Sequence, residues 1–173
     1  MPTTPTSYEA LTVAAAITML ATSTTFQTLV GAVGVAAAKA KIIESWGGNP
    51  GRTGGKGKAT ATDGTQFVMA PPYALVHQSE MSSSIGGISS YDYSGTVMIE
   101  IHLSRVSGNE APPDTFVRGR NIMGAIRTEM QALFGAASCL ATGSVDSAGP
   151  TLPEDSGADG AELIADLTLE WIA

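Results

Sequence analysis

The sequence contains few of the residues that usually carry catalysis or bind metals. It has one cysteine, Cys139, and two histidines, His77 and His102, among 173 residues. A single cysteine excludes an internal disulfide and a cysteine-based zinc site. Only 14% of the residues are charged, against 43% that are hydrophobic. This balance supports a folded core, and the low surface charge fits either burial in an oligomer or a plain Ala- and Gly-rich composition.

Long apolar runs are also missing. Leu11 to Leu20 is too short and too rich in threonine to span a membrane. No basic segment precedes an apolar stretch, so we expect neither a signal peptide nor a membrane partner.

Basic residues are scarce, and the charge is uneven. The net charge is -7; residues 1–90 hold five Lys or Arg and four acids, whereas residues 91–173 hold four Arg and twelve acids. This argues against general nucleic-acid binding, which needs a net basic face. It suits head-to-tail contacts between copies, although acidic side chains also serve solubility.

The last eighty or so residues have the clearest pattern. Tyr91 to Val106 alternates apolar and polar residues, with Val97, Ile99, Ile101 and Leu103 on one face. A Pro-Pro break and Asp114 or Thr115 as cap precede a helix over residues 114–134, which Gly135 ends. Glu162 to Ile172 alternates again, which predicts a final strand whose core face is Leu163, Ala165, Leu167, Leu169 and Trp171.

The first half is less regular. Thr6-Ser7-Tyr8-Glu9 predicts a capped helix that ends near Ala21 and is apolar most of the way round, so a neighbouring subunit is one way to cover it. A short second helix should follow the Ser23-Thr24-Thr25 cluster. Lys39 to Ser45 fits a strand or a continued helix, and we favour the strand. Pro71-Pro72 leads into a strand over Tyr73 to Glu80, and Met81 to Ser90 is typical of a loop.

Together these elements predict a single domain, residues 1–173, of the α/β (α+β) class. We expect about four strands in an antiparallel or mixed sheet, packed by the N-terminal helix and the helix near 114–134. Two long loops should interrupt it: a flexible Gly/Lys-rich loop at 47–65 and an acidic loop at 144–160.

None of the candidate chemical motifs is complete. Gly51 to Gly57 has the wrong glycine spacing for a phosphate loop, and Gly57 stands where that motif needs Ser or Thr. His77, Glu100 and His102 are compatible with a metal site, because two of them share a strand face, but polar residues on a solvent face are commoner. No Gly-x-Ser-x-Gly motif is present. We expect no enzyme, no cofactor and no metal.

Charged side chains are the better candidates for partner or subunit contacts. Arg118, Arg120 and Arg127 line the outer side of the expected helix, where they are either solvated or meet the acidic loop of another copy. The candidate contact residues are Arg52, Lys56, Lys58, Arg118, Arg120, Arg127, Asp155 and Asp159.

The order of elements resembles bacteriophage tail terminator (tail completion) proteins, a group of head–tail connector proteins. The resemblance rests on three stretches: Ala70-Pro71-Pro72-Tyr73-Ala74-Leu75-Val76, Tyr91-Asp92-Tyr93-Ser94-Gly95 and Leu167-Thr168-Leu169-Glu170-Trp171. It covers residues 6–173 as architecture, and the 47–65 loop has no counterpart in the pattern.

The resemblance implies a structural virion protein that assembles in the host cytoplasm into a ring, usually a hexamer. Such a ring sits at the head-proximal end of the tail, ends tail tube polymerisation and joins the tail to the head connector or stopper. DNA passes through its lumen. The alternatives are another neck or stopper protein and, less favoured, a metal-dependent enzyme using His77, Glu100 and His102.

Overall fold

The computed structural model describes residues 7–44, 58–60, 66–68, 71–87, 90–104, 112–136, 140, 142–151 and 162–172. Four helices are described: α1 (Tyr8–Thr22), α2 (Thr24–Leu29), α3 (Val35–Lys39) and α4 (Pro112–Gln131). Seven strands are described: β1 (Ile42–Glu44), β2 (Lys58–Thr60), β3 (Gln66–Val68), β4 (Tyr73–Gly87), β5 (Ser90–Ser104), β6 (Thr142–Thr151) and β7 (Glu162–Ile172).

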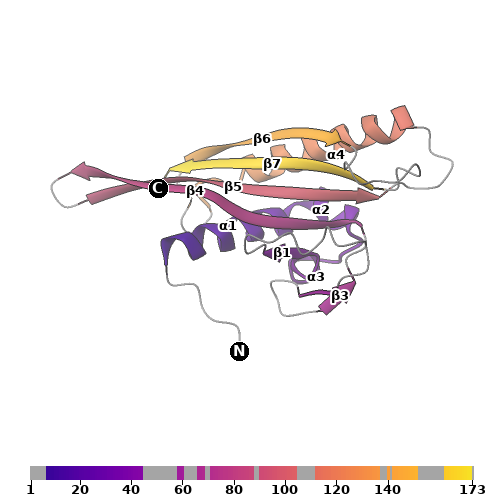
Figure 1. Ribbon diagram of the computed structural model, residues 1–173, viewed down its shortest axis with the longest axis horizontal. Coiled ribbons are helices and arrows are strands. Elements are labelled where there is room, and N and C mark those ends of the chain that lie inside the picture. Colours follow the sequence, from indigo (N-terminus) through magenta and orange to yellow (C-terminus); the bar gives the residue numbers. More distant parts are fainter. Residues whose placement is uncertain are drawn as a thin grey trace.

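Five strands form the main sheet, in the order β1-β4-β5-β7-β6 (Figure 1). The short strand β1 is parallel to β4, and every other pairing in this sheet is antiparallel. A separate two-stranded sheet joins β2 and β3. The predicted α+β class and mixed sheet are confirmed, and the main sheet has one strand more than expected.

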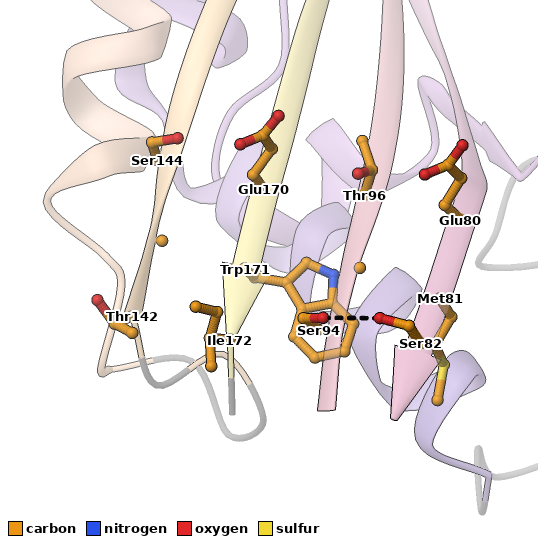
Figure 2. A pocket seen from close by; sticks show the side chains of 12 residues that line it. Glu80, Met81, Ser82, Ser94, Thr96, Thr142, Ser144, Glu170, Trp171 and Ile172 are labelled. Carbon is orange, nitrogen blue, oxygen red and sulfur yellow. Dashed lines mark hydrogen bonds between the residues drawn. The ribbon is translucent and has the colours of Figure 1, made fainter. Parts of the chain in front are cut away.

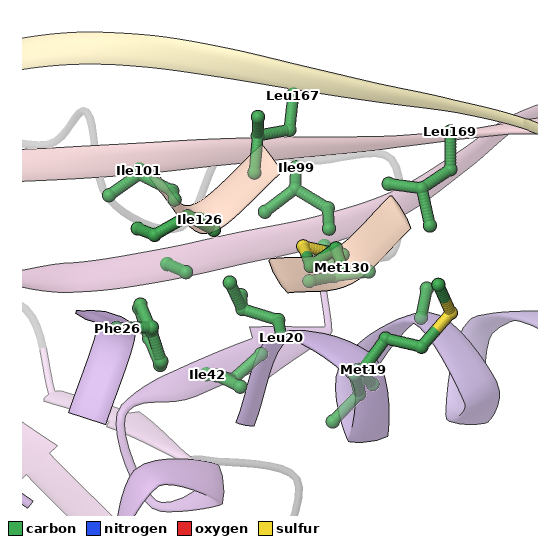
Figure 3. Packing of buried hydrophobic residues seen from close by; sticks show 14 of the residues in the cluster. Met19, Leu20, Phe26, Ile42, Ile99, Ile101, Ile126, Met130, Leu167 and Leu169 are labelled. Atoms are coloured by element: carbon green, nitrogen blue, oxygen red, sulfur yellow. The ribbon is translucent and has the colours of Figure 1, made fainter. Parts of the chain in front are cut away.

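The helices pack on one face of the main sheet. Figure 3 shows Ile99, Leu167 and Leu169 of the sheet pointing toward Ile126 and Met130 of α4 and toward Leu20 of α1. These side chains are almost completely buried. Burying each such side chain contributes about 1.5–3 kcal/mol before the entropy of ordering is counted. The strand faces predicted for β5 and β7 are therefore the core faces.

Local signals explain the helix starts. The Ser7 hydroxyl accepts a hydrogen bond from the Ala10 N–H at 3.2 Å and caps α1, and the Ser23 hydroxyl accepts from the Phe26 N–H at 3.0 Å and caps α2. Gly31 and Gly34 have φ values of 66° and 87°, which favour glycine and separate α2 from α3.

Helix α4 begins two to three residues earlier than predicted, and the proposed cap at Asp114 or Thr115 is wrong. The helix starts at Pro112 because proline is well tolerated in the first turn, where its missing N–H would have no helical partner. Asp114 lies inside the first turn, where its negative charge is favourable.

Three expected loops contain strands instead. Residues 81–87 and 90 belong to β4 and β5, residues 144–151 belong to β6, and residues 58–60 form β2. Glycine and aspartate, and to a lesser degree lysine and alanine, are depleted in strands, so these strands leave little sign in the sequence. Pairing decides their structure: β4 with β5, β6 with the edge of β7, and β2 with β3. The remainder of the 47–65 and 144–160 segments lies outside the described residues.

The ambiguous segment at 39–45 is split between two elements. Helix α3 carries the alanine run as far as Lys39, and β1 covers only Ile42 to Glu44. Ser45, like Cys139, lies outside the described residues.

Gly95 allows the close packing of the sheet against Trp171. A Cβ atom on Gly95 would lie 2.7 Å from the Glu80 carbonyl oxygen and 2.9 Å from Cζ2 of Trp171. We expect Gly95→Ala to lower the free energy of unfolding by about 1–3 kcal/mol, because backbone and a packed indole must both move. Urea denaturation measures this change.

Gly124 provides the matched control, because a Cβ atom there has nothing within 4 Å. Gly124→Ala should raise the free energy of unfolding by about 0.5–1 kcal/mol through helix propensity. Equal effects of the two alanines would contradict this packing of Gly95.

Candidate functional site

The face of the sheet opposite the helices carries an open groove near the end of β7. The groove has a volume of about 830 Å³ and is lined by β4, β5, β7 and β6. In the register of these strands, Glu80 pairs with Thr96, Thr96 with Glu170, and Glu170 with Ser144. One row of side chains therefore crosses four strands, as Figure 2 shows.

A second row lies beside the first. It contains Ser82, Ser94, Ile172 and Thr142, and the Ser82 and Ser94 hydroxyls are hydrogen-bonded at 2.8 Å (Figure 2). Ile172 is 54% exposed. The groove thus presents two carboxylates and several hydroxyls beside the apolar side chains of Met81, Trp171 and Ile172, a mixed lining that suits a macromolecular contact better than binding of a small apolar ligand.

An aromatic cluster supports the groove from the helix side. Tyr8 of α1 stacks on Tyr93 with ring centroids 4.2 Å apart and lies 5.5 Å from the Trp171 ring. Trp171 is 1% exposed, and its indole N–H has no hydrogen-bond partner in the described part of the chain. Aromatic packing between α1, β5 and β7 therefore supports the groove floor.

The arginines of α4 lie on the other side of the sheet from the groove. Arg120 and Arg127 are exposed, and Arg118 is partly buried. Asp155 and Asp159, the acidic partners that the sequence indicated on another copy, lie outside the described residues. Arg52 and Lys56 lie there too, and only the backbone of Lys58 is described, in β2.

Gln131 closes part of the sheet edge. Its side-chain NH₂ group donates to the Gly143 carbonyl at 2.9 Å, and its Oε1 accepts from the Val145 N–H at 2.8 Å. The amide replaces the two bonds that another strand would make at this part of β6. Sequence reasoning could not single out Gln131, because its partners belong to a strand that was expected to be a loop.

Glu129 of α4 connects this helix to the N-terminus of α2. Its carboxylate accepts hydrogen bonds from the hydroxyls of Ser23 (2.5 Å), Thr24 (3.0 Å) and Thr25 (2.8 Å), and from the Thr25 N–H (3.2 Å). Burial alone would raise the pKa of Glu129, but these bonds together hold it below its usual value. The carboxylate also lies at the N-terminus of α2, where negative charge is favourable.

The metal candidates share the outer face of the sheet. His102 Nε2 lies 3.6 Å from Glu100 Oε2, and the His102 ring stacks on Tyr73 with centroids 4.3 Å apart. His77 is placed opposite Met98 on the neighbouring strand. Among the residues that the structure describes, no group of three His, Cys, Asp or Glu is arranged to hold a metal ion.

Asp166 is the residue of this cluster that sequence reasoning missed. It lies directly opposite Glu100 in the β5–β7 register. Burial raises the pKa of Asp166, the charge of Glu100 raises it further, and His102 and His77 oppose the change. The alternation of β7 did place Asp166 on this face, but only the register between strands shows that two carboxylates oppose each other.

Comparisons with known proteins do not assign the chain to a family. No protein-family model matches it, and no curated protein proves similar to it. None of the described helices has the length and apolar character that crossing a membrane requires.

We predict that Glu129→Gln destabilises the protein by about 1 kcal/mol, because Ser23 and Thr25 lose a charged acceptor and one of its two oxygens becomes an NH₂ donor. Glu129→Gln keeps the size of the side chain but removes the charge. The wild-type advantage over this variant should be full above pH 4.5, the ordinary pKa of a glutamate, and disappear as the pH falls through the lowered folded-state value. Urea denaturation between pH 3 and pH 7 measures it, and a constant difference across that range would contradict the assignment.

Asp166 should show the opposite dependence on pH. Because its pKa is raised in the folded state, ionisation at neutral pH weakens folding, and this loss is absent at low pH. Asp166→Asn should therefore be more stable than wild type at pH 7 and nearly equal to it near pH 3. Asp146→Asn, an exposed carboxylate on β6, is the matched control and should change stability little. A stabilisation that persists at pH 3 would exclude the charge as its cause.

Proposed function

We propose that this protein is a structural subunit of a ring at the head-proximal end of a phage tail, of the tail terminator type. The proposal rests on the order of elements that resembles this family and on one structural observation, the projecting β4–β5 ribbon. The ring would end tail tube polymerisation and join the tail to the head connector. One architecture can serve many functions, so the support for this proposal comes from the surfaces of this chain.

The ribbon consists of the ends of β4 and β5 that extend past the rest of the sheet (Figure 1). The pairing of β5 with β7 ends at Ser94, and the pairing of β4 with β1 ends at Val76. Beyond these points, Ser83 to Gly87 and Ser90 to Tyr93 pair only with each other among the described strands. Both outer edges of the ribbon therefore offer backbone N–H and C=O groups to a partner, and its reach beyond the body suits contact with an adjacent subunit.

The outer side of α1 supports assembly in a second way. Leu11, Ala14, Thr18 and Thr22 line an apolar groove of about 400 Å³ together with Leu133 and Ala136. The Thr18 and Thr22 hydroxyls bond back to the carbonyls of Ala14 and Thr18, each at 2.8 Å. Their methyl groups are left as the outward surface. A neighbouring subunit is one way to cover this remaining apolar side of α1.

Such a subunit acts through the complementarity of its surfaces. A heterologous contact between copies forms a ring if its rotation closes. One face of that ring would match the tail tube, and the other would match the connector or stopper without repeating the tube contact. DNA would pass through the lumen of the assembled virion, and no catalytic residue or cofactor takes part. A stopper or other neck protein would also form a ring, but it would bind the connector and leave the length of the tail tube unchanged.

We predict that the purified protein forms rings, visible by negative-stain electron microscopy and with a multiple of the subunit mass by light scattering. Added to polymerising tail tube protein, it should stop elongation and shorten the tubes. A strictly monomeric protein that never binds tubes would refute the proposal. Rings that bind only the head connector would favour the neck-protein alternative.

A shortened ribbon separates assembly from folding. Replacing residues 85–91 with Asn-Gly should close a tight hairpin between Ser84 and Asp92. The β5–β7 pairing starts further along the chain, at Ser94, so stability should change little. We expect this variant to remain folded and to lose ring formation and tube termination.

A further inference from the structure

Two arginines lie on the exposed side of α4. Arg120 and Arg127 are exposed and make no ion pair within the described residues. They are seven residues apart, so they lie on nearly the same side of the helix, about 10 Å apart along its axis. Gly124 lies between them with open space beside it, since a Cβ atom added there would have nothing within 4 Å. A flat partner surface can therefore approach the helix closely.

Two carboxylates on the open sheet face have the same spacing. Glu80 and Glu170 are exposed, and both lie in the row that crosses the groove (Figure 2). They are two strands apart, with Thr96 between them, which places their backbones about 10 Å apart. A helix lying across the strands would set one arginine over each carboxylate.

These groups cannot meet within one chain. Helix α4 buries Met123, Ile126 and Met130 against the core face of the sheet, whereas Glu80 and Glu170 point from the opposite face. The arginines of α4 and the carboxylates of the sheet have the same spacing and opposite charge, and they lie on opposite sides of the subunit. The arginines of one copy therefore fit the carboxylates of a second copy. Because the two surfaces differ, the contact is head-to-tail, which is the kind that generates rings.

We propose that α4 of one copy docks across the groove of the next, with Arg120 and Arg127 opposite Glu80 and Glu170. This deepens the proposed ring and rests on it. The hydroxyl of Ser144 lies in the same row and can hydrogen-bond the docked helix. The sequence indicated acidic residues of the 144–160 segment as partners of these arginines. The docking proposed from the structure uses Glu80 and Glu170 instead.

Charge reversal tests the docking. The acid-face variant Glu80→Lys/Glu170→Lys and the helix variant Arg120→Glu/Arg127→Glu should each be folded monomers, with subunit affinity lowered about tenfold or more. Mixing the two should restore an alternating ring, because each variant helix then meets a complementary sheet face. The quadruple variant should form rings by itself. It keeps the net charge at -7, so it controls for total charge.

Gly124→Gln provides a test that does not change charge. Glutamine favours helix more than glycine, so the subunit should be no less stable. Its side chain fills the space through which the neighbouring sheet must approach, so rings should be lost. Circular dichroism reports folding, and light scattering in low and high salt reports assembly, which should weaken as salt screens the charges.

The outcomes separate the two proposals. If wild type forms rings and both charge-reversed variants do as well, the ring stands and this docking surface is wrong. A folded quadruple variant that stays monomeric would overturn the pairing in the same way. A wild-type protein that never assembles would overturn the ring and the docking surface together.

Discussion

The antiparallel register of β5 with β7 is the constraint on which the rest of the structure depends. It runs without a break from Ser94–Ile172 to Ser104–Glu162. Because side chains alternate between the two faces, shifting either strand by one residue would move its core residues to solvent. The buried residues Ile99, Leu167 and Leu169 therefore also decide what lies opposite them. The polar row of the groove is a direct consequence of the packing of the core.

Helix α4 is oriented by two polar side chains near its C-terminal end. Glu129 bonds the N-terminus of α2, and Gln131 bonds the edge of β6. Two residues apart on a helix, they point about 200° apart, to nearly opposite sides. With Met130 buried between them, these contacts leave little freedom to rotate the helix about its axis. Arg120 and Arg127 are exposed because these contacts fix which side of α4 faces outward.

The sequence was sufficient where burial produces a regular pattern. Strands β5 and β7, the buried stripe of α4 and the cap at Ser23 were all predictable, since each depends on spacing or on a local hydrogen bond. Strand β6 and the ends of β4 and β5 were not predictable, because their many Ser, Gly and Asp residues do not favour strands. These segments become strands only by pairing with their neighbours. The role of Glu129 was invisible for a related reason: Ser23 is 106 residues away in the chain. Of the candidate contacts, Arg120 and Arg127 could be named from helical spacing, but Glu80 and Glu170 needed the register of three strands, β4, β5 and β7.

The two carboxylate pairs on the outer face differ in a way that bears on function. Glu100 and Asp166 are directly opposed, and burial together with the charge of Glu100 raises the pKa of Asp166, so this pair weakens the subunit at neutral pH. Glu80 and Glu170 are exposed and separated by two strands. At about 10 Å in water, two like charges repel by only ~0.4 kcal/mol, and salt reduces this further. The subunit can therefore hold both charges at almost no cost to its own stability. A neighbour that excludes water from the groove lowers the local dielectric, so the attraction to two arginines grows on docking. In the proposed docking, Glu80 and Glu170 would therefore be nearly neutral for folding and would act chiefly at the contact with a neighbouring copy.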